Sequence, residues 1–225
     1  SPRVPPVGLA VIGGGIAVGG SGAAATANYI EDVFSTYLYT GTGATQTVTN
    51  GINLSGNGGL VWMKDRSISS DHALYDTTRG ATFQLSSNLN TAQSTQATGL
   101  TSFSSSGFTV GALATINTTS DLFASWTFRK KTNFFDIVTY TGTGANRTIS
   151  HNLGSTPGSI IVKRTDTNAN WRVYHSGLTS AAYSIIFNNT AAQASTPTVW
   201  NSTAPTSSVF SVGTDSTVNA SGGTY

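Results

Sequence analysis

Short runs in which apolar and polar side chains alternate recur along most of the chain, and glycine, asparagine and serine residues separate them. Alternation with a period of two is typical of half-buried β-strands, and the intervening residues are typical of turns. Seven such strands within about 100 residues predict a β-sandwich. In the first half of the chain the expected strands are Thr36–Thr40, Thr45–Thr49, Leu60–Lys64, Ala73–Asp76, Thr82–Leu85, Phe108–Gly111 and Leu122–Phe128.

The same alternation assigns the side chains that should face a core, because successive residues of a strand point to opposite faces of a sheet. In the first half these are Tyr37, Tyr39, Val61, Met63, Leu74, Phe83, Phe108, Val110, Phe123 and Phe128. In the second half they are Tyr140, Ile160, Val162, Val173, Ile185, Phe187, Phe210 and Val212.

An internal repeat with a spacing of about 100 residues runs through these strands. The stretch Tyr39-Thr-Gly-Thr-Gly-Ala44 recurs as Tyr140-Thr-Gly-Thr-Gly-Ala145. We therefore expect an all-β protein of two tandem, jelly-roll-like β-sandwiches; a single large lectin-like sandwich, with one sheet from each copy, is the alternative. Further pairs in the same register are Thr47–Thr49 with Thr148–Ser150, Val61–Lys64 with Ile160–Lys163, His72–Tyr75 with Trp171–Tyr174, and Phe108–Gly111 with Phe210–Gly213.

The repeat also predicts the domain boundaries. Tyr225 aligns with Phe123, which lies near the start of the last strand of the first copy. The final strand of the second copy should therefore be incomplete, and since an open apolar edge favours aggregation, we expect the natural chain to continue past Tyr225. The expected domains are an attachment arm over residues 1–34, a first sandwich over 35–131 and a second sandwich over 132–225.

Residues 1–27 are rich in glycine and apolar residues and differ from the rest of the chain. The run Val11–Val18 resembles a dinucleotide-binding turn, but the third glycine position is Val18 and no βαβ pattern follows. Arg3, the apolar run and Ala25-Thr-Ala27 resemble a signal peptide, and the many glycines argue against a membrane-spanning helix. We favour an extended arm that binds a partner subunit through Val7, Leu9, Val11, Ile12, Ile16 and Val18.

Composition narrows the possible partners. Charged residues make up 9% of the chain and the formal net charge is +2. Nucleic-acid-binding proteins usually carry a dense basic patch, whereas the densest basic stretch here, Arg129-Lys130-Lys131, is typical of a solvated connector. We therefore expect no nucleic-acid partner and no membrane insertion. The absence of cysteine excludes disulfides and thiolate metal sites.

The candidate catalytic and metal motifs are incomplete. Asp71-His72 and His175-Ser176 lack the nucleophile turn of a hydrolytic triad. The segment Asp166–Asn170 opens like a calcium loop, but Trp171 occupies the glycine position and Gly177 the glutamate position. We thus predict no catalytic, cofactor-binding or metal-binding residue, although a carboxylate pair such as Asp71 and Asp76 remains an alternative. Four tryptophans are candidates for stacking on sugars, with packing the favoured interpretation: Trp62, Trp126, Trp171 and Trp200.

Several segments resemble tail and tail-fibre proteins of cyanophages and other marine bacteriophages. They are Asn28–Gly43, Gly59–Lys64, Ala124–Lys130, Phe134–Gly142 and His151–Gly158, together with Ile161-Val-Lys163 and Trp171-Arg-Val-Tyr-His175. The resemblance extends over nearly the whole chain from Asn28 to Tyr225. It implies a virion tail component, sometimes described as lectin-like, and supplies no catalytic residues.

These patterns together predict the virion-attaching part of a bacteriophage tail fibre, located in the virion tail and not an enzyme. The arm would bind other tail or baseplate proteins, and distal parts would contact the host, with a surface glycan as one possible receptor. By analogy with other fibres we expect a homotrimer. A capsid decoration protein and a carbohydrate-binding module are the alternative functions.

Overall fold

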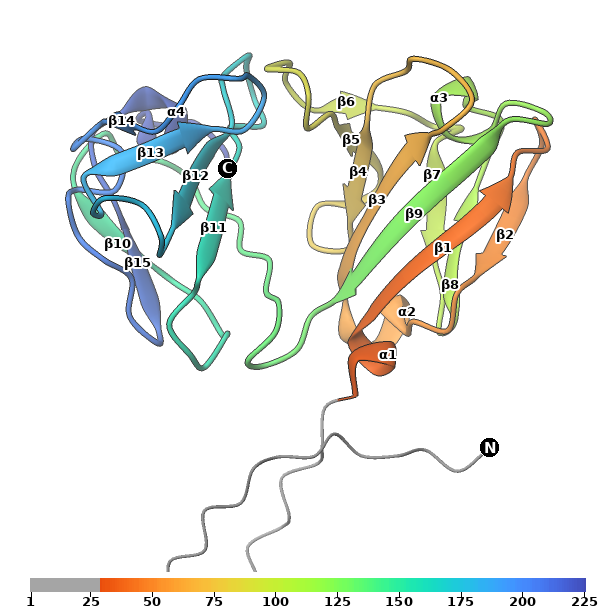
Figure 1. Cartoon of the computed structure of the whole chain (residues 1–225), viewed down its shortest axis with the longest axis horizontal. Helices are drawn as coiled ribbons and strands as arrows, with labels where there is room; N and C mark the ends of the chain where they lie inside the picture. Colours follow the sequence, from red (N-terminus) through yellow and green to blue (C-terminus); the bar gives the residue numbers. More distant parts are fainter. Residues whose placement is uncertain (1–28) are drawn as a thin grey trace, which may run out of the picture.

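The computed structural model describes residues 29–225 and contains β-strands with four short helices. The strands form two halves that lie side by side, and an irregular segment links them (Figure 1). Every pair of adjacent strands among the described residues is antiparallel. The prediction of an all-β protein is confirmed.

In the first half, a six-stranded sheet with the order β1-β9-β3-β4-β5-β6 packs against a three-stranded sheet with the order β2-β8-β7. Strand β9 lies between β1 and β3 and pairs with both of them along its length. The elements are α1 (Ile30–Val33), β1 (Phe34–Thr40), β2 (Gln46–Thr49), α2 (Leu54–Asn57), β3 (Gly59–Asp65), β4 (Ala73–Asp76), β5 (Gly80–Leu85), β6 (Ser94–Thr95), β7 (Leu100–Phe103), β8 (Gly107–Val110), α3 (Ala114–Asn117) and β9 (Leu122–Arg129).

The second half contains a four-stranded sheet with the order β11-β12-β13-β14 and a two-stranded sheet of β10 and β15. Thr141 and Thr224 form an isolated antiparallel bridge at the end of the chain. The elements are β10 (Arg147–Ser150), β11 (Ser159–Val162), β12 (Arg172–His175), β13 (Tyr183–Ile186), β14 (Ala194–Ser195), β15 (Val209–Val212) and α4 (Ser216–Asn219).

Each half has its own hydrophobic core. Strand β3 shows how alternation builds the first core, because Val61 and Met63 are fully buried in it while Leu60 and Trp62 face the other side of the sheet. Loops and short helices add buried side chains that no strand pattern indicates: Ile52, Leu54 and Ile116 in the first half, and Val199, Trp200 and Val218 in the second.

Two side chains that were predicted to face a core are exposed. Tyr37 lies in β1, which is the outermost strand of its sheet, and the centre of this strand is exposed to solvent. Phe187 lies just after β13 and is 38% exposed. The Tyr37 prediction is wrong because alternation identifies a face of a strand but not whether another element covers that face. The Phe187 prediction is wrong because the strand ends at Ile186, so the alternation does not extend to this residue.

The two halves repeat the same hydrogen-bonded hub. Asn117, at the end of α3, accepts a hydrogen bond from the Thr42 amide and donates to the Ala44 and Gly111 carbonyls. In the second half, Asn219 at the end of α4 makes the corresponding bonds with Thr143, Ala145 and Gly213. The shared Tyr-Thr-Gly-Thr-Gly-Ala sequence is therefore the loop that wraps around a buried asparagine in each half.

Close backbone approach explains the first glycine of this loop. A Cβ atom on Gly41 would lie 2.0 Å from the Thr118 carbonyl oxygen, and one on Gly142 would lie 2.2 Å from the Ala220 carbonyl oxygen. Both distances are far below van der Waals contact, so a side chain at either position would push the loop away from its hub.

A junction between the halves centres on Trp171. Its indole N–H donates to the Ser86 carbonyl at 3.1 Å and to the Leu89 carbonyl at 2.9 Å, and its ring packs against Leu74 and Leu85. Backbone hydrogen bonds from Gln93 to Thr165 and from Ala169 to Asn90 cross the same junction. Apolar packing and hydrogen bonds together hold the halves against each other.

No helix within residues 29–225 is long and apolar enough to cross a membrane.

Candidate functional site

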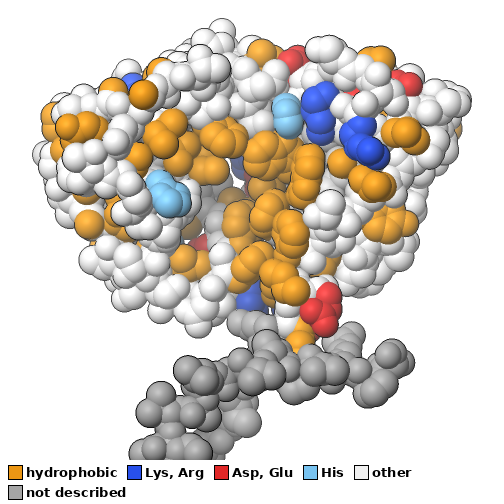
Figure 2. Space-filling view, viewed as in Figure 1, with side chains coloured by type: hydrophobic (Ala, Val, Ile, Leu, Met, Phe, Trp, Pro, Cys, Tyr) orange, Lys and Arg blue, Asp and Glu red, His pale blue; other side chains and the backbone are white. Residues whose placement is uncertain are grey.

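A cavity of about 510 Å³ lies between the two halves. Apolar side chains gather along the cleft that leads into it (Figure 2). One wall is the outer face of the six-stranded sheet, with Leu60, Trp62 and Leu74, and the opposite wall is β11. The linking segment Phe134–Tyr140 and the residues Trp171 and Phe187 also line it.

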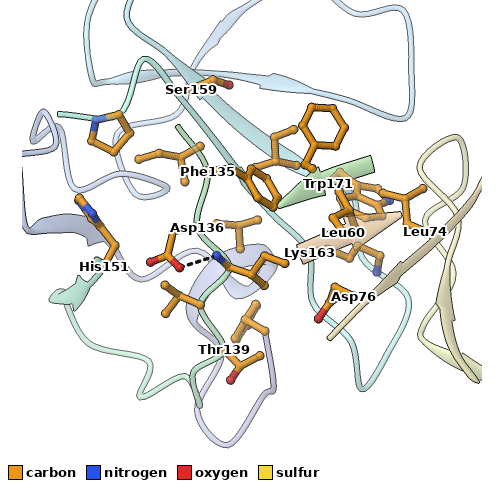
Figure 3. Close-up of a pocket in the computed structure, with 18 of the residues that line it drawn as sticks. Leu60, Leu74, Asp76, Phe135, Asp136, Thr139, His151, Ser159, Lys163 and Trp171 are labelled. Carbon is orange, nitrogen blue, oxygen red and sulfur yellow. Dashed lines mark hydrogen bonds between the residues drawn. The ribbon is translucent and has the colours of Figure 1, made fainter. Parts of the chain in front are cut away.

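The local sequence explains why this cavity is apolar. Strand β3 has large apolar residues at consecutive positions. Val61 and Met63 pack in the first core, and Leu60 and Trp62 therefore lie on the outer face of the sheet. Leu60, Leu74 and Trp171 gather at one end of the cavity, whereas Asp136 and His151 lie at the other end (Figure 3).

Asp136 is the acidic residue at the end of the cavity that also holds His151. Its carboxylate pairs with the Lys130 ammonium at 3.0 Å and accepts hydrogen bonds from the Asn152 and Ile137 amides. Burial alone would raise the pKa of this carboxyl, but the hydrogen bonds from Asn152, Lys130 and Ile137 outweigh it and the pKa is lowered. Asp136 is therefore a charged anchor that fixes the linking segment to the second half.

Lys163 is a buried ammonium group in the junction. Its Nζ donates to the Arg164 carbonyl at 2.6 Å and to the Asn90 carbonyl of the first half at 3.3 Å. Removal from water disfavours the charged form and lowers the pKa of Lys163 from 10.5 to about 8, although nearby Asp166 acts in the opposite direction.

The stability of the protein should consequently depend on the charge of Lys163. Between pH 8 and 10.5 the unfolded chain holds a proton on this residue that the folded chain has released, so the free energy of unfolding should rise with pH across this window. The rise is expected to be at most about 3 kcal/mol. Urea unfolding at pH 7 and 9.5 should show it in the wild type and not in Lys163→Met.

Lys64 provides the matched control for this prediction. It holds the equivalent position in the first half, and its Nζ likewise donates to the carbonyl of the next residue, Asp65, at 2.6 Å. Lys64→Met should keep the wild-type rise in stability between the two pH values. An equal rise in Lys163→Met and in the wild type would contradict the prediction.

A cluster of aromatic rings borders the cavity on the outer face of the six-stranded sheet. Trp62 lies edge-on to Trp126, His72 and Phe187, with ring centroids 5.7–6.2 Å apart. The Trp62 indole donates to Nδ1 of His72 at 2.8 Å. Burial is the main cause of the lowered pKa of His72, and Lys64 lowers it further. The His72 ring therefore packs against Trp62.

The comparison with protein-family models gave a match that covers nearly all of the described residues. A family model with the description "Domain of unknown function (DUF7483)" matches residues 30–225. The chain belongs to this family. The search of curated proteins and the search of solved structures gave no match.

The motif that resembles a calcium loop has other partners in this DUF7483 domain. Asp166 forms a two-pronged ion pair with Arg164 at 2.8 and 2.9 Å, and the Arg164 hydrogen bond is the main cause of its lowered pKa of about 2. The side-chain oxygen of Asn168 accepts from the Ala92 amide, and that of Asn170 accepts from the Asn188 amide group. Among the described residues, no group of three His, Cys, Asp or Glu side chains is placed to hold a metal ion.

The remaining candidate residues of the domain are dispersed. The Asp71 carboxylate accepts from Asn88, and the Asp76 carboxylate pairs with Arg79. His175 accepts from the Gly177 amide through Nδ1. Of the four tryptophans, Trp171 and Trp200 are buried, which confirms the packing interpretation for these two. The predicted partner-binding residues Val7, Leu9, Val11, Ile12, Ile16 and Val18 lie outside the described residues.

Sequence reasoning missed the cavity and the burial of Lys163. The signal that was present is the pair of apolar residues on the outer face of β3, Leu60 and Trp62, together with the aromatic pair Phe134 and Phe135 in the linking segment. An outward-facing apolar set on a strand indicates that a further element covers it.

Proposed function

We propose that the chain is a structural protein of a bacteriophage virion, namely the virion-attaching part of a tail fibre. The observation that supports this role best is the junction between the halves, where Trp171 is buried against the first half and backbone hydrogen bonds cross on either side of it. A joint of this kind transmits force and orientation between two domains, which is what a fibre shaft needs. The role proposed is structural and involves no catalytic step.

The finer architecture belongs to the same proposal. Two copies of one sandwich unit, residues 35–131 and 132–225, would form consecutive segments of the shaft. The hubs around Asn117 and Asn219, with matching partners in each half, support a common origin of the two units. Residues 1–34 would attach the shaft to a tail or baseplate protein, within a homotrimer.

The proposal is tested on intact virions of the phage that encodes this chain. Antibody fragments raised against residues 30–225 should label appendages at the tail when the virions are imaged by electron microscopy. Label spread over the head would overturn the proposal in favour of a capsid decoration protein. Virions without label and without the chain in their protein content would also overturn it.

The role of the predicted arm can be tested in the same system by complementation. Val11→Asp combined with Ile12→Asp should abolish incorporation of the chain into virions, because charge is costly to bury in an apolar contact. Ile68→Asp is the matched control, since Ile68 is an exposed apolar residue of the first half. Equal incorporation of both variants would contradict attachment through these residues.

A further inference from the structure

Strand β1 forms an open edge of the six-stranded sheet in the first half. It pairs with β9 along all seven of its residues, from Phe34 opposite Phe128 to Thr40 opposite Leu122. No other strand within residues 29–225 pairs with it, and in Figure 1 it lies on the side of its sheet away from the second half. The second edge of β1 therefore presents backbone groups that have no strand partner in the described part of the chain.

The centre of β1 is exposed on both faces of the strand. Tyr37 is 38% exposed and Leu38 is 58% exposed. Their side chains point to opposite faces of the sheet, because they are neighbours in a strand. Thr36 is exposed as well, so the exposed stretch 36–38 is centred on Tyr37. Neither the second half nor any loop among the described residues covers this part of the edge.

Strand β1 also lacks the features that usually protect an edge strand. Proteins keep such strands short, place charged residues or proline in them, or interrupt them with a bulge. Strand β1 contains no charged residue, proline or glycine, and its register with β9 is unbroken. The other edge strands of the described sheets have only two to four residues, and they are β2, β6, β7, β10, β11, β14 and β15. A long, uncharged and regular edge is an association site.

We propose that β1 pairs antiparallel with β1 of a second copy of this chain, about a two-fold axis at Tyr37. The two six-stranded sheets then continue into each other. A two-fold axis places the exposed stretch opposite itself, with Tyr37 opposite Tyr37 of the second copy and Leu38 opposite Thr36 of the second copy.

The absence of charge in β1 favours a second copy as the occupant. Pairing about a two-fold axis brings a residue at the centre of the strand opposite the same residue, so a charge there would meet a like charge and destabilise the pair. The sequence Phe-Ser-Thr-Tyr-Leu-Tyr-Thr avoids this repulsion along the whole strand. Exposed aromatic and aliphatic side chains at its centre gain cross-strand contacts instead.

This inference concerns β1 alone and does not rest on the tail-fibre proposal. A three-fold assembly of arms and a two-fold contact at β1 are compatible, because two trimers can pair through their β1 strands into a closed hexamer. Loss of the β1 contact halves the mass of the assembly in either case, whether the remaining unit is one chain or three.

Sedimentation velocity of the full chain measures this mass. Tyr37→Lys should halve it and raise the dissociation constant of the contact by about tenfold, because two ammonium groups then lie opposite each other and the tyrosine pair is lost. Ile68→Lys is the matched control and should keep the wild-type mass, since Ile68 is a 56% exposed apolar residue of the same half that lies outside the strands. Equal masses of the wild type and Tyr37→Lys would overturn the proposal. They would also be the result if another segment of the same chain covers β1.

Opposite charges test the pairing of β1 with itself. Tyr37→Glu alone should dissociate like Tyr37→Lys, whereas an equimolar mixture of the two variants should regain the wild-type mass, because a lysine then lies opposite a glutamate. Tyr37 is exposed, so both variants should keep the circular dichroism of the wild type. A mixture that stays dissociated would overturn the two-fold pairing, and so would a wild-type chain that sediments as a monomer.

Discussion

Replacing Trp171 by alanine is expected to lower the free energy of unfolding by about 3–5 kcal/mol and to uncouple the two halves. The indole is 5% exposed, packs on Leu74 and Leu85, and donates to two carbonyls of the first half. Its removal leaves a cavity and two carbonyl groups without their donor. Calorimetry should show one transition in the wild type and two separate transitions in the variant, because each half retains its own core.

Trp126→Ala is the matched control for this prediction. Trp126 is only half-buried, on the outer face of the six-stranded sheet, and belongs to the first half alone. Its loss should lower stability by less and should leave a single transition. A single, unshifted transition in Trp171→Ala would show that other contacts across the junction are sufficient to couple the halves.

The strand positions could be predicted from the sequence wherever buried and exposed side chains alternate. The expected strand Ala73–Asp76 has the bounds of β4, and the expected strands Leu60–Lys64 and Leu122–Phe128 each differ by at most one residue at either end from β3 and β9. Strands β6 and β7 were not predicted. Strand β6 consists of Ser94 and Thr95 alone and gives no apolar signal.

The parts of the core that come from loops could not be predicted in this way. Ile52 and Ile116 are fully buried, yet they lie between strands or in a helix of one turn, where no periodicity marks a face. Their burial follows from long-range contacts, such as the hydrogen bond from the Tyr39 hydroxyl to the Ile116 carbonyl at 2.7 Å. In the second half the Tyr140 hydroxyl donates to the Val218 carbonyl in the same way, so both halves make this contact.

The cavity could not be predicted from the sequence for a related reason. Its lining combines β3 of the first half with β11 of the second, and the contact between them depends on how Trp171 and the linking segment place the halves. A repeat in the sequence predicts that two units are similar but contains no information about the surface through which they meet. Outward-facing Leu60 and Trp62 and the aromatic pair Phe134 and Phe135 were the local indications.

The hub asparagines should be as important for stability as a core aromatic residue. Asn117→Ala is expected to lower the free energy of unfolding by about 3 kcal/mol, because the three hydrogen bonds of a fully buried amide are lost and the Gly111 carbonyl stays buried without another donor. Asn219→Ala should have a similar effect through the equivalent partners in the second half. Urea unfolding of the two single variants measures both effects.

Asn88→Ala serves as the control for the same chemical change at an exposed position. Asn88 also makes hydrogen bonds, to Asp71 and His72, but water can replace them, so its loss should cost well under half as much. A neutral Asn219→Ala beside a destabilising Asn117→Ala would show that only the first half depends on its hub. Equal losses of stability would instead mean that a fully buried amide closing the Tyr-Thr-Gly-Thr-Gly-Ala loop stabilises both halves. This requirement would then explain why the loop sequence is the same in each half.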